Sequence, residues 1–204
     1  MKNITREDIC CVSCKFGCQL TGEATDLLNR CPLQKIAVWP GRNYFMTKGV
    51  LSIVSGQYES VFCRGCVFVD FSARNLRYFT NRNWIDYLRL TKLNIILICD
   101  TPMEALALYW KREDQAISTV ITGQESLEEI KKSINYSYYG IKGGGKYKGN
   151  PLSKDEVRFL DLVVNDRSLI SISRELMVEV KKIYNMKDSI RRKTGLSLNK
   201  LLSR

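Results

Sequence analysis

Residues 151–204 of this chain are PLSKDEVRFLDLVVNDRSLISISRELMVEVKKIYNMKDSIRRKTGLSLNKLLSR, and helical periodicity runs through most of them. Ser153 followed by Glu156 has the S-x-x-E spacing of a capping box, which marks the start of a helix. Apolar residues then recur at helical spacing, at Val157, Leu160 and Val164. The segment therefore predicts a helix that begins directly after Ser153.

The remainder of this segment predicts three more helices. Ser168 is a natural N-cap for a helix with inward-facing Ile172 and Leu176. After a break at 177–179, a third helix has an apolar side formed by Ile183, Met186 and Ile190. Gly195 has the residue type that commonly ends a helix, and 198–202 predicts a short fourth helix.

The other side of the third helix carries cations, an amide and a phenol. Such groups can meet phosphates and base edges when a helix enters the major groove of DNA. The candidate groove and phosphate contacts are Lys181, Lys182, Tyr184, Asn185 and Lys187, and the candidate phosphate anchors are Arg191 and Lys193. A small helical bundle with a solvated basic face is the alternative, and composition alone favours it.

The order of residues resembles the C-terminal DNA-binding domain of the LuxR/FixJ family of bacterial regulators. The resemblance covers about a quarter of the chain and runs without a gap through Leu152, Ser153, Glu156, Leu160, Ser168, Ile172, Leu176, Val178, Ile183, Ile190, Lys193 and Gly195. It implies a four-helix helix-turn-helix domain. The chain departs from the family pattern at Glu179, Lys182 and Met186, so the DNA sequence that it would bind need not be the usual one.

Charge and composition limit the function classes. The chain has 204 residues and a formal net charge of +11, which favours an acidic partner. Residues 151–204 hold twelve Lys and Arg against seven Asp and Glu. The chain has no histidine, so Ser-His and Cys-His catalytic pairs are impossible within it and an enzyme is disfavoured. No membrane span or secretory signal is apparent, and we expect a bacterial cytoplasmic, nucleoid-associated protein.

Residues 1–136 alternate between short apolar runs and helical patterns. The predicted strands are 8–13, 35–39, 66–69, 94–99 and 117–121, and the predicted helices are 17–30, 44–54, 84–90, one from Pro102, and 126–134. Five strands alternating with five helices predict a parallel α/β sheet covered on both faces. Residues 137–150 contain five glycines and predict a flexible basic linker. The third part, 151–204, is the helix-turn-helix domain.

This arrangement resembles a response regulator, which implies a flavodoxin-like (βα)5 receiver domain followed by the DNA-binding domain. The segment from Cys14 to Arg30 is further similar to the first helix of the RcsA/BglJ group of auxiliary regulators, which lack a working phosphorylation site. That resemblance implies a heterodimer with a response regulator of the same family, formed through the receiver or the last helix. A homodimer on two half-sites is the alternative.

Asp70 stands at the position of a phosphoacceptor, at the end of the third predicted strand. A working receiver also needs an acidic pair for Mg²⁺ near Ser13 and Cys14, and a lysine near Thr122 and Gly123. The sequence has neither the acidic pair nor the lysine at these positions. We therefore expect a pseudo-receiver in which Asp70 is an ordinary polar residue.

Eight cysteines include two C-x₂-C pairs, Cys11 with Cys14 and Cys63 with Cys66. Two such pairs can hold zinc, and the first and third strands of a flavodoxin-like sheet are neighbours. Residues three apart on a strand point to opposite faces, however, which disfavours chelation. Buried thiols are the more common role in a core. We expect neither metal nor cofactor.

The sequence thus predicts a sequence-specific, DNA-binding transcription regulator that acts as a homodimer or heterodimer on double-stranded DNA, without a membrane partner. The alternative is an adaptor or anti-regulator whose basic tail binds another protein.

Overall fold

A parallel sheet forms the centre of the first part of the chain. The computed structural model describes residues 9–13, 15–21, 35–54, 65–139 and 149–203. Within them, four strands pair in parallel in the order β1-β2-β3-β4. The strands are β1 (Ile36–Trp39), β2 (Cys66–Phe71), β3 (Asn94–Cys99) and β4 (Ile117–Thr122). The predicted α/β class with a parallel sheet is confirmed.

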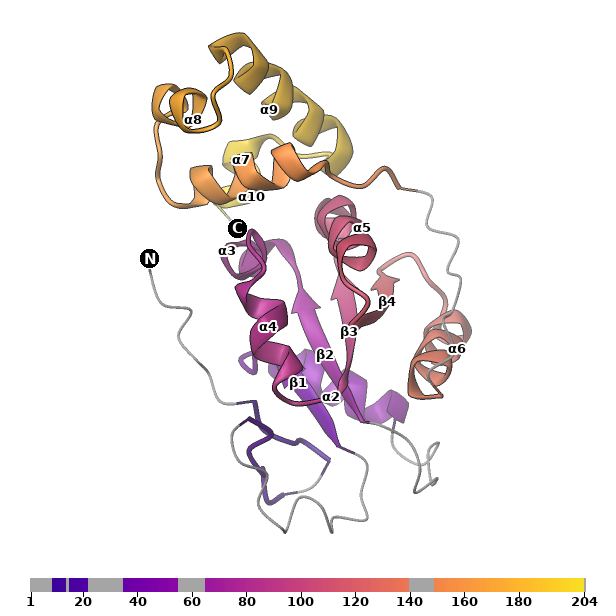
Figure 1. Ribbon diagram of the computed structural model, residues 1–204. Helices are drawn as coiled ribbons and strands as arrows, with labels where there is room; N and C mark the ends of the chain where they lie inside the picture. The colour runs from indigo at the N-terminus through magenta and orange to yellow at the C-terminus, as the bar shows by residue number, and fades with distance from the viewer. Residues whose placement is uncertain (1–8, 14, 22–34, 55–64, 140–148, 204) are drawn as a thin grey trace.

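Helices cover both faces of this sheet (Figure 1). They are α2 (Tyr44–Val54), α3 (Leu76–Phe79), α4 (Asn83–Arg89), α5 (Glu104–Glu113) and α6 (Leu127–Tyr138), with 3-10 turns η1 (Ala73–Asn75) and η2 (Thr101–Met103). Because side chains alternate along a strand, each strand supplies both cores. Phe68 packs in the cluster that includes Val50 of α2 and Ile134 of α6. Val67 and Val69 pack in the other cluster, with residues of α3, α4 and α5.

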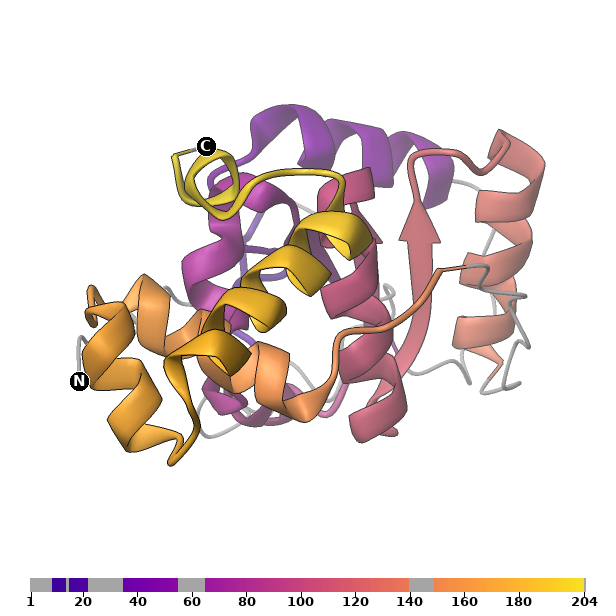
Figure 2. The ribbon, with the colours of Figure 1, turned by 90° about the horizontal axis from the view of Figure 1, so that it is seen from above.

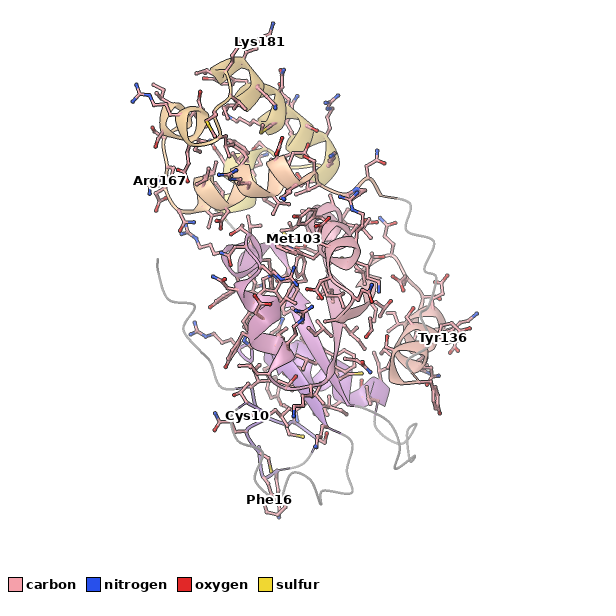
Figure 3. All side chains as sticks on the ribbon, viewed as in Figure 1. Cys10, Phe16, Met103, Tyr136, Arg167 and Lys181 are labelled. Carbon is pink, nitrogen blue, oxygen red and sulfur yellow. The ribbon has the colours of Figure 1, made fainter. Side chains whose placement is uncertain are left out.

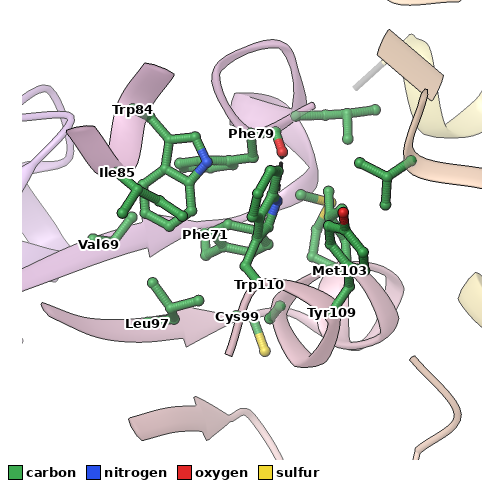
Figure 4. Close-up of a cluster of buried hydrophobic side chains, with 14 of the residues drawn as sticks. Val69, Phe71, Phe79, Trp84, Ile85, Leu97, Cys99, Met103, Tyr109 and Trp110 are labelled. Atoms are coloured by element: carbon green, nitrogen blue, oxygen red, sulfur yellow. Dashed lines mark hydrogen bonds between the residues drawn. The ribbon is translucent and has the colours of Figure 1, made fainter. Parts of the chain in front are cut away.

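Aromatic rings fill the second cluster near the carboxyl ends of the strands (Figure 4). Phe71 stacks on Phe79 with ring centroids 4.1 Å apart. The indole N–H of Trp110 donates a hydrogen bond to the carbonyl oxygen of Phe79 at 2.8 Å. This bond joins α5 to α3 within the buried interior.

The first predicted strand is not part of the sheet. Of the predicted helix 17–30, residues 17–21 are not helical, and the remainder lies outside the described residues. The β-bridge assigned within residues 9–13 is an isolated antiparallel one, between Cys10 and Gln19, and the N–H of Val12 donates to the carbonyl of Ile36 at 2.7 Å. The chain reverses near Gly17, which has φ +57°, and the N–H of Leu20 donates to the carbonyl of Ile9 at 2.7 Å. A segment that folds back at once cannot make the crossover that a parallel strand needs. β1, at 36–39, is therefore the neighbour of β2, and the predicted adjacency of the first and third strands is wrong.

The C-terminal helices match their sequence signals closely. They are α7 (Lys154–Val164), α8 (Leu169–Glu175), α9 (Val180–Thr194) and α10 (Leu198–Leu202). Ser153 and Glu156 form the expected capping box, and Ser168 accepts a hydrogen bond from the N–H of Ser171. Gly195 ends α9 in the left-handed conformation, at φ +71°. The predicted four-helix unit is confirmed.

This helical unit packs over the carboxyl ends of the strands, as Figures 1 and 2 show from two directions. Its buried residues belong to the same apolar cluster as those of α3 and α5. The backbone N–H of Leu152 donates to the carbonyl of Ala105 at 2.9 Å. The Asp161 carboxylate accepts hydrogen bonds from the Thr80 hydroxyl at 2.6 Å and the Asn81 amide at 3.2 Å. The two parts are thus joined by apolar packing and by polar contacts.

The boundary between these parts stays a prediction. α6 continues to Tyr138, two residues into the segment that the sequence indicates as a linker. Residues 140–148 of that segment lie outside the described ranges. None of the described helices is long and apolar enough to cross a membrane.

Replacing Asp161 with alanine should loosen the contact between the two parts. Thr80 is 2% exposed, so its hydroxyl would lose a partner in a place where water has little access. We expect a loss of about 1–3 kcal/mol in the free energy of unfolding, measured by urea denaturation. Asp155 on the same helix is the matched control. Its side chain is exposed, and its ion pair with Lys182, at 3.9 Å between two solvated groups, contributes little to stability. Equal stability of Asp161→Ala and Asp155→Ala would contradict the role of Asp161.

Candidate nucleic-acid interface

Helices α8 and α9 are joined by the short turn 176–179, which has its own hydrogen bonds. The Ser173 hydroxyl donates to the carbonyl of Val178 at 2.6 Å, and the N–H of Val178 donates to the carbonyl of Ser173 at 3.0 Å. Met177 takes a left-handed conformation at φ +52°, which glycine adopts more readily. These bonds fix the direction in which α9 leaves the turn, and so the geometry of the helix-turn-helix.

α9 is divided lengthwise into a buried side and an exposed side. The buried residues are Ile183, Met186, Ile190 and Thr194. Of the predicted groove and phosphate contacts, the exposed ones are Lys181, Lys182, Tyr184 and Asn185. Lys187 is half-buried. Arg191 is exposed as well. Its guanidinium lies 3.8 Å from the Asp188 carboxylate, and an ion pair between two solvated side chains contributes little to stability. The structure therefore brings six of the seven predicted residues to an accessible surface.

The first turns of α9 lie away from the sheet. Lys181 marks the end of the molecule farthest from the strands in Figure 3, whereas Met103 lies where the two parts meet. The N-terminal residues of a recognition helix are those that contact base edges in helix-turn-helix proteins. Nothing in the described part of the chain covers these turns of α9, so a duplex can approach them.

The departures from the LuxR/FixJ pattern differ in their consequences. Met186 is 7% exposed and packs in the core. It therefore affects how α9 packs against the other helices and does not itself contact a ligand on the exposed side. The Lys182 side chain is 55% exposed and its Nζ lies 3.9 Å from the Asp155 carboxylate. An exposed pair at this distance contributes little, so Lys182 can exchange Asp155 for another anion.

Lys193 has another partner in this structure. Its ammonium donates to the Glu156 carboxylate at 2.7 Å and to the carbonyl of Pro151 at 3.0 Å, and its side chain is only 23% exposed. A phosphate contact would have to break this pair and leave Glu156, 5% exposed, without its counter-charge. We therefore assign Lys193 to holding the start of α7 against α9.

The Glu156 carboxylate is the acid-sensitive group of this unit. Burial by itself raises the pKa of Glu156, but hydrogen bonds from Lys193, Ser189 and the Ser153 backbone outweigh it, so the pKa lies below its ordinary value of 4.5. A carboxyl group whose pKa is lower in the folded state contributes stability above the unfolded-state pKa. That contribution is lost as the pH falls through the folded-state pKa.

Substitution of Glu156 by glutamine should therefore matter less as the solution becomes more acidic. Glutamine keeps the capping box but cannot form the ion pair with Lys193. We expect the stability difference between wild type and Glu156→Gln to be full near pH 7 and to shrink below about pH 4.5. Urea denaturation across this range measures it, and a difference that is constant with pH would contradict the assignment.

Asp70 lies at the carboxyl end of β2, where the sequence places the phosphoacceptor position. It is 5% exposed, and its Oδ2 accepts a hydrogen bond from the Asn43 amide at 2.9 Å. Asn43 follows β1, so the loop after β1 takes the place expected for the acidic pair. Ser13 accepts a hydrogen bond from the N–H of Ile36, at the opposite end of the sheet. The expectation that Ser13 and Cys14 mark the Mg²⁺ position is therefore wrong, and Cys14 lies outside the described residues.

The polar residues at the other strand ends have hydrogen-bond partners within the protein. Asp100, after β3, accepts a hydrogen bond from the N–H of Ala73 at 3.1 Å. Thr122, at the end of β4, donates from its N–H to the Glu125 carboxylate at 2.8 Å. Among the described residues no set of three or more carboxylates and thiols is arranged to bind a metal ion. Asp70, Asp100 and Thr122 thus each bond to a different group of the protein.

Acetyl phosphate with Mg²⁺ should leave the protein unmodified. The physical reason is that Asp70 has an amide neighbour, Asn43, where a receiver needs a carboxylate to hold the cation. Intact-mass measurement after incubation tests this. A phosphoryl adduct on the wild type that is absent from Asp70→Ala would contradict it.

Each of the two C-x₂-C pairs has one cysteine in the part of the chain that the structure describes. Cys11 and Cys66 are buried in separate apolar clusters, while Cys14 and Cys63 lie outside the described residues. Burial, with the nearby carboxylates of Glu104, Asp100 and Glu125, raises the pKa of the Cys99 thiol to about 12. A thiol with that pKa stays protonated at neutral pH and is a poor nucleophile.

Two features of the interface were missed at the sequence level. Asp161 falls on the polar side of the α7 pattern, and nothing local indicates that Thr80 and Asn81 meet it from a segment some eighty positions earlier. Val180 continues the apolar spacing of α9 and would be assigned to the core, yet it is 43% exposed. A helical wheel centred on Ile183 and Ile190 places Val180 at the edge of the apolar side, and this position could have indicated that Val180 is partly exposed.

Comparison with known proteins gives a family match and one close relative. The family model described as EcpR N-terminal domain matches residues 10–138. The uncharacterized protein YqeH of Escherichia coli (strain K12) is 30% identical over 200 residues, which cover 97% of this chain and 94% of YqeH. The relative therefore matches both the sheet and the helix-turn-helix.

Two solved structures are similar over most of the chain. RcsB dimers bound to two parallel DNAs have 18% identity and a TM-score of 0.37, over 68% of this chain and 72% of RcsB. Full-length FixJ from B. japonicum has 14% identity and a TM-score of 0.26, over 76% of this chain and 78% of FixJ.

Proposed function

Because this chain belongs to the EcpR N-terminal domain family, and its sheet carries an exposed helix-turn-helix, we propose that it binds double-stranded DNA and regulates transcription. The observation that carries this proposal is the exposed side of α9, where cations, an amide and a phenol lie together on the part of the helix farthest from the sheet. A net charge of +11 provides the long-range attraction to a polyanion.

The exposed residues divide into two groups by what they can contact. Lys181, Tyr184 and Asn185 lie in the first two turns and can reach base edges, because an amide can bond adenine and a lysine can bond guanine. Lys182, Lys187 and Arg191 lie on the flanks or farther along the helix and suit phosphates, which position the protein without reading sequence.

The sheet then positions α9 without phosphoryl chemistry. Asp70 is buried and bonded to Asn43, so a signal would have to arrive as a partner or as a change in abundance. One helix-turn-helix makes few contacts, and a dimer on two half-sites multiplies them. We propose a homodimer, or a heterodimer with a response regulator of the same family, in the bacterial cytoplasm at the nucleoid.

Substitutions on α9 separate base contacts from phosphate contacts. A preferred duplex is first selected from a random pool with the full chain. We expect Asn185→Ala to weaken binding to that duplex by about 1–3 kcal/mol and to leave binding to random duplex nearly unchanged. Lys182→Ala should weaken both by a similar factor and lower the dependence of affinity on salt, because fewer counterions are released. Fluorescence anisotropy at several salt concentrations measures both effects.

Lys200→Ala is the control for charge alone, because Lys200 is an exposed cation on α10. If Lys200→Ala weakens binding as much as Asn185→Ala, the exposed side of α9 is not the recognition surface. If the full chain selects no sequence and binds duplex no better than other polyanions, the proposal fails. The adaptor function, with a protein bound by the basic tail, then becomes the better explanation.

A further inference from the structure

Large apolar side chains are exposed at the tip of the helix-turn-helix. Among the described residues they include Ile170 at 60%, Met177 at 90%, Val180 at 43% and Tyr184 at 52% exposed. Val180 and Tyr184 are one turn apart on α9, and residues at this spacing lie on the same face of a helix. The exposed side of α9 is thus not uniformly charged but contains an apolar pair.

Cations surround this pair. Lys181 and Lys187 each lie three residues from Tyr184, one toward each end of the helix, and both side chains are at least partly accessible. An apolar pair within a basic surface fits an occupant that has anionic edges and an apolar group between them. The major groove of DNA has this arrangement, with phosphates along its rims and the 5-methyl group of thymine on its floor.

Other occupants fit the surface less well. A helix that lies on a membrane buries a whole apolar side in the lipid, whereas the apolar side of α9, with Ile183, Met186 and Ile190, is buried in the protein. Even with Ile170 and Met177 included, the exposed apolar side chains are far fewer than the roughly 20–30 residues that each side of a stable interface between copies of the chain contributes. The lysines around them would also repel the lysines of a second copy.

We propose that Val180 and Tyr184 contact thymine methyl groups in the major groove, so that each half-site contains A·T pairs at the positions facing them. This rests on the proposed function and adds to it a base preference that hydrogen-bonding residues do not supply. Val180 is the first residue of α9, so its methyl groups lie at the start of the helix. The Tyr184 ring supplies a larger apolar surface one turn later, and its hydroxyl can still bond a base or a phosphate.

Replacement of thymine by deoxyuridine tests this directly. Deoxyuridine lacks the 5-methyl group but keeps the same pairing and the same hydrogen-bonding edge. In the duplex selected with the wild-type chain, each thymine is replaced in turn. At one or two positions in each half-site we expect the affinity to fall about fourfold, which is the factor that burial of one methyl group gives.

Variants then show which side chain meets which methyl group. Val180→Ala should weaken binding to the thymine duplex and abolish the deoxyuridine effect at one position. Tyr184→Ser should do the same at another position, whereas Tyr184→Phe should keep it. Ile170→Ala is the matched control, because it removes exposed apolar surface from α8 and should leave every thymine-to-deoxyuridine ratio unchanged. All three side chains are exposed in the wild type, and thermal unfolding checks that each of the four variants is folded.

The possible outcomes are separable. If the wild type selects a half-site but no thymine there responds to deoxyuridine, or if Val180→Ala and Tyr184→Ser leave the ratios unchanged, the thymine contacts are wrong while DNA binding stands. If the same variants instead reduce binding to vesicles of phosphatidylglycerol and leave DNA affinity unchanged, the surface is a membrane contact and the inference is overturned. If the wild type selects no duplex, the proposed function itself fails.

Discussion

One continuous apolar core, shared by the end of the sheet and the helix-turn-helix, is the feature on which the rest of the structure depends. Phe79 and Met103 from the sheet side belong to the same cluster as Phe159, Leu160 and Ile190 from the helical side. A unit of the size of residues 151–204 buries a smaller fraction of its surface than a larger domain does, and is marginally stable alone. Packing against the platform formed by the ends of the strands therefore supplies part of the apolar contact that α7 to α10 cannot provide for one another.

This shared core determines how α9 is presented. The side of α9 with Ile183 and Ile190 is held in the interior, and hydrogen bonds from Thr80 and Asn81 to Asp161 link the helical unit to the sheet part. The opposite side and the first turns of the helix are then directed away from the sheet (Figure 3). A basic surface held rigidly in this way loses little conformational entropy when it binds, which favours affinity.

The same end of the sheet is where a receiver would carry out phosphoryl transfer. Here the polar groups at the strand ends are bonded to one another, as Asp70 is to Asn43 and Asp100 to the backbone of Ala73. The sheet has kept the parallel architecture and uses the end of its strands for structural packing. In this structure the receiver-like part packs against the helix-turn-helix through the apolar cluster at this end of the sheet.

Local signals were sufficient for much of the structure. Several predicted features depend only on neighbours in the chain, and the structure has them where the sequence predicts. They are the capping box of Ser153 and Glu156, the helix end at Gly195, and the strands predicted at 94–99 and 117–121. The exposed cations of α9 also follow from helical periodicity. The strand predicted at 8–13 failed because a short apolar run does not reveal that the chain turns back near Gly17.

The sequence by itself determined the fold class and the two-sided character of α9, because periodicity and capping act over a few residues. Only the tertiary structure decided that β1 is the neighbour of β2, that Lys193 is occupied by Glu156, and that Val180 is left exposed. Each of these depends on groups that are distant in sequence, or on the angle at which a helix meets its core. The order of residues along the chain does not encode these contacts locally, since they arise only when the sheet and the helices pack together.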